Sequence, residues 1–73
     1  MKTRVLLVDD EKGFVEVLAQ RLEIRYFDVA TALSGDEALE RLQESDFDVV
    51  VLDVLMPGKN GVEVLKEIKQ KMN

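Results

Sequence analysis

The feature that most constrains this chain is an uncharged run of residues that ends in an acid. Val49–Leu52 are apolar throughout, three of the four being valine, and Asp53 follows directly. Such a run predicts a strand buried on both faces, as in a parallel sheet. Ligands of open α/β sheets bind beyond the carboxyl ends of the strands, which makes Asp53 a candidate site residue. An aspartate at a strand end is equally common as a turn former or helix cap, so its partners must decide its role.

The same pattern occurs near the start of the chain. Residues 5–8 are all apolar, and Asp9, Asp10 and Glu11 follow them. We therefore predict a second strand that ends in carboxylates. Residues 27–32 alternate loosely between apolar and other side chains, which indicates a third strand between these two in the sequence.

A helix is predicted after each strand, because apolar residues recur there at spacings of three and four. The first helix spans residues 12–25, the second begins at a capping box formed by Ser34 and Glu37, and the third follows Gly61. The side chains expected to face the core are Phe14, Val17, Leu18 and Leu22 in the first helix, Ala38, Leu39 and Leu42 in the second, and Val62, Leu65, Ile68 and Met72 in the third.

The resulting order, β-α-β-α-β-α, indicates an α/β fold with parallel strands and right-handed crossovers. We expect the strand order 2-1-3, with the first helix on one face of the sheet and the other two on the opposite face. The first and third strands in the sequence are then neighbours about 5 Å apart, so Asp9, Asp10 and Asp53 converge at one edge. The last strand in the sequence, Val49–Leu52, then forms an open edge of the sheet.

Three converging carboxylates repel one another, and either a hard divalent cation or protonation of one group relieves them. The chain contains no His and no Cys, so oxygen ligands and magnesium are the expected chemistry. A carboxylate beside such an ion can attack a phosphoryl donor.

Composition narrows the function classes further. A chain of 73 residues is enough for one small domain, and its net charge of −5 disfavours binding to nucleic acid or to an anionic membrane. The longest apolar run is too short to span a bilayer, and no signal peptide is visible. We expect a cytoplasmic protein.

Three stretches, residues 5–11, 34–39 and 51–61, resemble the receiver domain of bacterial response regulators at that family's spacing. The resemblance implies a three-layer, flavodoxin-like fold in which Asp53 is the phosphoacceptor and a histidine kinase is the donor. It also implies that magnesium is bound weakly by Asp10, Asp53 and the backbone carbonyl of Leu55, with Asp9 acting through a water.

The family fold has five βα units, and this sequence corresponds to the first three. We therefore expect residues 1–73 to be a truncated receiver domain, the N-terminal half, completed by self-association. The family's hydroxyl residue after the fourth strand and its lysine after the fifth have no counterpart here, so we expect impaired phosphorylation and no enzyme activity of the chain's own. The family usually has glycine where Tyr26 stands, which predicts a left-handed backbone conformation for this tyrosine.

Two other interpretations are open, and a third is excluded. The chain could be a truncated or engineered half-domain that acts only as a homo-oligomer, through its third strand and an uncovered sheet face. Ile24, Tyr26, Leu33 and Leu55 are candidate contact residues. Half of a (βα)₈ barrel has the same alternation of strands and helices, but it fits Pro57-Gly58 and the capping box less well. Walker B carboxylates of a P-loop NTPase are excluded, because no Gly-Lys-Ser/Thr loop occurs.

Overall fold

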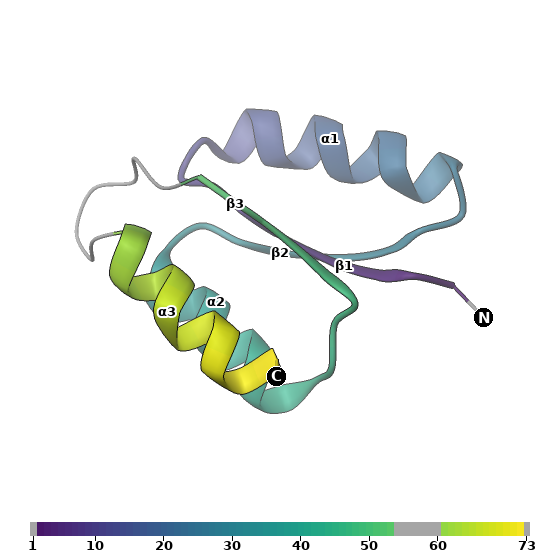
Figure 1. The fold of residues 1–73 in the computed structure, drawn as a ribbon. Helices are drawn as coiled ribbons and strands as arrows, with labels where there is room; N and C mark the ends of the chain where they lie inside the picture. Colours follow the sequence, from purple (N-terminus) through teal and green to yellow (C-terminus); the bar gives the residue numbers. More distant parts are fainter. Residues whose placement is uncertain (1, 54–60, 73) are drawn as a thin grey trace.

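The computed structural model describes residues 2–53 and 61–72, and its elements follow the predicted order. They are β1 (Arg4–Val8), α1 (Lys12–Ile24), β2 (Asp28–Ala32), α2 (Gly35–Glu44), β3 (Val49–Leu52) and α3 (Gly61–Met72). The three strands are parallel in the order β2-β1-β3. Figure 1 shows α1 on one face of the sheet and both α2 and α3 on the other. The predicted three-layer, flavodoxin-like α/β arrangement is confirmed.

The middle strand, β1, separates two hydrophobic cores. Leu6 and Val8 face α2 and pack with Ala32 and Ala38. Val5 and Leu7 face α1, where they pack with the two buried residues of that helix, Val15 and Ala19. Successive side chains of a strand point to opposite faces, so a strand between two helix layers needs an unbroken apolar sequence. In this sheet β1 meets that condition on both faces.

β3 does not: the burial on both faces that its apolar run predicts is wrong, whereas the uncovered sheet face expected for a half-domain is present at this strand among the described residues. Val50 and Leu52 pack into the core on the α2 and α3 side, whereas Val49 and Val51 are 45% and 47% exposed on the side of α1. The reason is the position of α1, whose core contacts are with β1 and with the β2 side of the sheet, including Val29. β3 lies at the edge, beyond the reach of this helix.

The prediction for α1 was also partly wrong. Phe14 and Val17 were expected in the core, but they are 54% and 52% exposed. The buried residues are instead Val15 and Ala19, with Leu18 and Leu22 partly buried against them. Phe14 and Val17 lie on one apolar stripe of the helix, and Val15 and Ala19 lie on another. α1 packs the second stripe, which has the smaller side chains, against β1 and β2.

α3 shows the same kind of difference. Ile68 is buried as predicted, but its buried neighbour is Val64, while Val62 and Leu65 are exposed. α3 packs on α2 through Gly35, where a Cβ atom would come within 2.5 Å of Val64 Cγ2. The lack of a side chain at Gly35 therefore allows this close approach. The side chain of Met72 lies outside the described ones.

Two local predictions are confirmed. The Glu37 N–H donates to Ser34 Oγ at 3.1 Å, and Glu37 Oε2 accepts from the Leu33 N–H at 3.4 Å. Glu37 therefore completes the capping box through the backbone N–H of Leu33, the residue before the N-cap Ser34. Tyr26 has a φ of 68°, the left-handed conformation that ends α1. This conformation costs a residue with a Cβ atom roughly 1 kcal/mol or more.

Candidate functional site

The candidate site lies at the carboxyl ends of β1 and β3. Val8 and Leu52 are partners in the β1–β3 ladder, and the residue after each is an aspartate. Backbone hydrogen bonds hold both positions, since the Asp53 N–H donates to the Val8 carbonyl at 3.0 Å and the Asp9 N–H donates to the Ala32 carbonyl at 3.1 Å. The sheet thus fixes the backbone from which Asp9 and Asp53 project.

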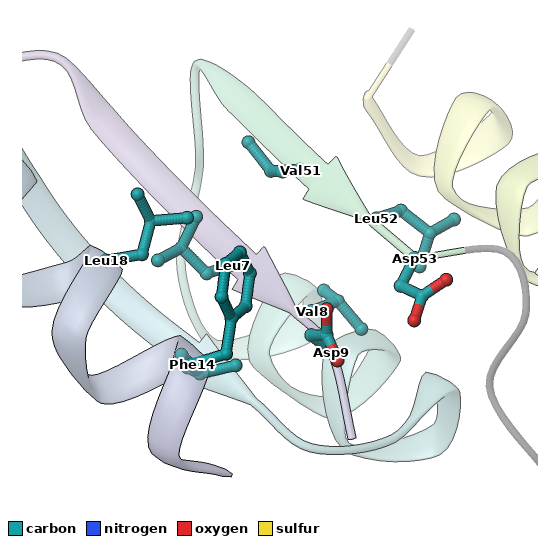
Figure 2. A pocket seen from close by; sticks show the side chains of 9 residues that line it. Leu7, Val8, Asp9, Phe14, Leu18, Val51, Leu52 and Asp53 are labelled. Carbon is teal, nitrogen blue, oxygen red and sulfur yellow. The ribbon is translucent and has the colours of Figure 1, made fainter. Parts of the chain in front are cut away.

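The carboxylates of Asp9, Asp10 and Asp53 meet at this edge. One oxygen of each lies within 4.8 Å of the others, with Asp9 and Asp53 partly buried and Asp10 exposed. Figure 2 shows the side chains of Asp9 and Asp53 close to each other, just beyond the two strand arrows. Asp9 Oδ1 also accepts a hydrogen bond of 3.0 Å from the Glu11 N–H, which orients its carboxylate as the chain turns into α1.

This set of donors is chemically suited to a hard divalent cation. All three groups offer carboxylate oxygens, the ligands that magnesium prefers, and magnesium is typically bound through one or two carboxylates with waters completing its octahedron. The spacing is short enough for one ion to be shared. The fourth predicted ligand, the backbone carbonyl of Leu55, lies outside the described residues.

An apolar pocket of about 140 Å³ adjoins the carboxylates on the α1 side of the sheet. Figure 2 shows Phe14 and Leu18 of α1 beside Leu7 of β1, and Val51 on the neighbouring β3. Phe14 was predicted in the core from its helical spacing, and its position beside the site was not predicted. One signal could have shown it, because the first turn of a helix that follows a strand must lie near that strand's carboxyl end.

None of the helices described in residues 2–53 and 61–72 has the length and apolar character needed to cross a bilayer.

Comparisons with known proteins point to one family. The family described as the response regulator receiver domain matches residues 5–73. The transcriptional regulatory protein CpxR homolog of Haemophilus influenzae is 49% identical over 71 residues, which are 97% of this chain and 31% of that protein. The chain therefore spans about a third of this curated relative.

Solved structures agree with this match. The response regulator TrrA of Thermotoga maritima, solved in complex with Mg²⁺ and BeF, has a TM-score of 0.87 and 42% identity, over 97% of this chain and 61% of that one. A second structure, of the histidine kinase ThkA in complex with TrrA, matches with the same TM-score and identity, over 97% of this chain and 60% of that one.

Proposed function

The chain belongs to the response regulator receiver domain family, and from this premise we propose that Asp53 is its phosphoacceptor in phosphorelay signalling. The observation that supports this role is the convergence of Asp9, Asp10 and Asp53 within 4.8 Å at the carboxyl edge of the sheet. Asp53 is the only one of the three that follows β3, and its backbone is fixed by the hydrogen bond to Val8.

Asp53 would act as a nucleophile. One of its carboxylate oxygens forms a bond to phosphorus while the bond between phosphorus and the donor's leaving atom breaks, which gives an acyl phosphate. The partly buried position of Asp53 limits the directions of approach, and in open α/β sheets ligands bind beyond the carboxyl ends of the strands, where Asp53 lies. The attacking carboxylate is thus positioned by the end of β3.

Magnesium is the proposed cofactor, bound weakly. Asp10 and Asp53 would hold it directly, together with the backbone carbonyl of Leu55, and Asp9 would hold it through a water. When bound, the ion offsets negative charge on the phosphoryl oxygens. The exposure of Asp10 and the small number of carboxylates agree with modest affinity. The complex of TrrA with Mg²⁺ and BeF supports this assignment.

A histidine kinase is the proposed phosphoryl donor. TrrA, which is 42% identical to this chain, was solved in complex with the histidine kinase ThkA. We propose a partner of the same class here, whose phosphohistidine meets Asp53 at the open edge of the site.

The test is chemical mapping of the acceptor. The chain is incubated with acetyl phosphate and magnesium, reduced with borohydride, digested and sequenced by mass spectrometry. Reduction converts an aspartyl phosphate into homoserine, so the modified position is read directly even at low yield. We expect homoserine at position 53, dependent on magnesium.

Two variants serve as controls. Asp53→Asn removes the proposed nucleophile and should abolish the label. Asp48→Asn changes an aspartate at the other end of β3 and should leave the label in place. Homoserine at a different aspartate, or labelling that is unchanged in Asp53→Asn, would contradict the proposal.

A further inference from the structure

Asp9 and Asp53 are held in place by two different strands. The Asp53 N–H donates to the Val8 carbonyl at 3.0 Å, so the backbone of Asp53 is fixed by β1. The Asp9 N–H donates to the Ala32 carbonyl at 3.1 Å, so the backbone of Asp9 is fixed by β2. Ala32 is the last residue of β2 and is fully buried. The distance between the two carboxylates therefore depends on where the Ala32 carbonyl lies.

The peptide group that joins Ala32 to Leu33 is held at both of its ends. A trans peptide group directs its C=O and its N–H to opposite sides. Here the carbonyl accepts the hydrogen bond from Asp9 on the side of β1. The Leu33 N–H donates to Glu37 Oε2 at 3.4 Å on the side of β2 that faces away from β1. Glu37 therefore contacts the same peptide group that anchors Asp9.

The preceding peptide group, which joins Thr31 to Ala32, is held in the same way by Arg41. Arg41 Nε donates to the Thr31 carbonyl at 3.4 Å, and Arg41 Nη2 lies 3.6 Å from Glu37 Oε1. Glu37 is fixed in turn at its own backbone, where its N–H donates to Ser34 Oγ at 3.1 Å. The two paired side chains, Glu37 and Arg41, thus contact both peptide groups that flank Ala32, and we call them the β2 clamp.

We propose that Glu37 is a positioning residue for the cation site, acting on Asp9 through the peptide group between Ala32 and Leu33. The proposal rests on the proposed function, in which Asp9 holds magnesium through a water. Glu37 acts in two ways. It fixes the direction of the Ala32 carbonyl, and its carboxylate polarises the peptide group, which strengthens that carbonyl as an acceptor for the Asp9 N–H. Arg41 keeps the Glu37 carboxylate in place.

The effect should be modest and confined to one side of the site. The hydrogen bond from the Leu33 N–H is long, and the side chains of the β2 clamp are 45% and 39% exposed, so water competes for their contacts. Asp53 should not respond, because its backbone is bonded to β1 and not to β2. This difference between Asp9 and Asp53 separates a positioning role from a general contribution to stability.

Amide hydrogen exchange, followed by NMR on the metal-free chain, measures both anchors in one sample. Glu37→Ala removes the acceptor of the Leu33 N–H and should raise the ratio of the Asp9 exchange rate to the Asp53 exchange rate by about threefold, as expected for the loss of a weak hydrogen bond. Glu40→Ala removes the same charge from an exposed position of α2 and should leave the ratio unchanged. A general loss of stability raises both rates together and leaves the ratio unchanged.

Two further variants keep the test independent of the capping role of Glu37. Glu37→Gln removes the charge but retains an oxygen that can accept from the Leu33 N–H, so it should restore most of the wild-type ratio. Arg41→Ala leaves the capping box intact and removes the ion pair, so it should raise the ratio by a smaller factor than Glu37→Ala. Circular dichroism confirms that each variant folds.

Magnesium affinity links the exchange rates to the site. A titration followed by the amide shift of Asp10 should show a dissociation constant raised by about twofold in Glu37→Ala, less than the tenfold or more that is typical for a group bonded directly to a metal ligand. Glu37→Gln and Glu40→Ala should bind magnesium as the wild type does. Because each of these variants loses one negative charge, a difference among them reports geometry and not net charge.

Two results would overturn the proposal. An unchanged ratio of the Asp9 and Asp53 exchange rates in both Glu37→Ala and Arg41→Ala would leave the β2 clamp with a structural role only. Equal losses of magnesium affinity in the three glutamate variants would assign the effect to net charge. The exchange ratio is measured without metal or phosphoryl donor, and homoserine mapping tests Asp53 without reference to Glu37, so a failure of the positioning role and a failure of the phosphoacceptor assignment give different results.

Discussion

The two ends of the sheet both gather aspartates, but they use them differently. At the amino end Asp28 and Asp48 surround the first residue of β1, Arg4. At the carboxyl end Asp9, Asp10 and Asp53 surround one another, with their oxygens within 4.8 Å. The same type of side chain therefore lies beside an arginine at one end and beside other carboxylates at the other.

Arg4 organises the amino end through four contacts. Its Nε pairs with Asp28 at 3.2 Å, its Nη1 donates to the Asp46 carbonyl at 2.9 Å, and its guanidinium lies 5.0 Å from the centre of the Phe47 ring. Its backbone N–H donates to Asp48 Oδ2 at 2.8 Å. These contacts join the first residues of β1 and β2 to the segment that leads into β3.

The comparison shows how surroundings decide what an aspartate does. An aspartate whose carboxylate pairs with an arginine, as Asp28 does with Arg4, has its charge offset within the fold, and its role is to fix the geometry of the chain. Aspartates that converge on one another retain a strong local field, which is the condition for attracting a cation. The contacts that fix the fold and the proposed cation site thus lie at opposite ends of the same three strands.

Removing the cation at the amino end should give the largest loss of stability. Arg4→Ala deletes an ion pair, a hydrogen bond to a carbonyl and a cation–π contact, and should lower the free energy of unfolding by about 2 kcal/mol. Urea denaturation at fixed protein concentration measures this. Arg25→Ala, at the exposed end of α1, is the matched control and should change the stability by less than about 0.5 kcal/mol. Equal losses in both variants would show that Arg4 has no special role.

Sequence patterns predicted the order, direction and neighbours of the elements, and they predicted the convergence of Asp9, Asp10 and Asp53. Both successes have a physical cause. Apolar strands alternating with amphipathic helices have few arrangements, and the handedness of crossovers removes most of them. Once β1 and β3 are neighbours, residues that follow them must lie side by side. The left-handed conformation of Tyr26 was predicted from the family resemblance alone, because the family usually has glycine at this position.

The sequence did not predict which helical stripe is buried. In α1 and α3 two apolar stripes overlap, and the choice between them depends on where the helix lies over the sheet. Val15 is buried because α1 covers β1 and β2, and Phe14 is exposed because β3 lies beyond that helix. In α3 the choice of Val64 depends on the missing side chain of Gly35, a long-range fact that no local periodicity contains.

Adding a cation at the carboxyl end is the counterpart of removing Arg4, and its effect should be somewhat smaller. Magnesium at ten times its dissociation constant should raise the free energy of unfolding by about 1.4 kcal/mol. Thermal unfolding is followed during a magnesium titration, with sodium chloride adjusted to constant ionic strength. Asp10→Ala should abolish the response, whereas Asp28→Asn at the amino end should keep it. A response that survives Asp10→Ala would place the ion elsewhere.

Replacing an aspartate by asparagine should have the smallest effect but gives the sharpest comparison. The resulting change in the free energy of unfolding is expected to have opposite signs at the two ends. In metal-free buffer Asp28→Asn removes an attraction to Arg4 and should lower the free energy of unfolding by about 0.5 kcal/mol. Asp10→Asn removes repulsion from Asp9 and Asp53 and should raise it by a few tenths of a kcal/mol, a gain limited by the exposure of Asp10.

Salt separates this electrostatic account from a change in packing. At 1 M sodium chloride the screening length falls to about 3 Å, so both differences should shrink toward zero. Chemical denaturation with urea, which adds no ions, measures the free energy of unfolding of the wild type and of both variants under each condition. If Asp10→Asn lowered the stability as Asp28→Asn does, the carboxyl-end aspartates would be structural like those around Arg4, and the contrast between the two ends would be lost. Opposite signs that converge in salt would show that the carboxyl end is held under charge repulsion, the state in which a bound cation stabilises the fold.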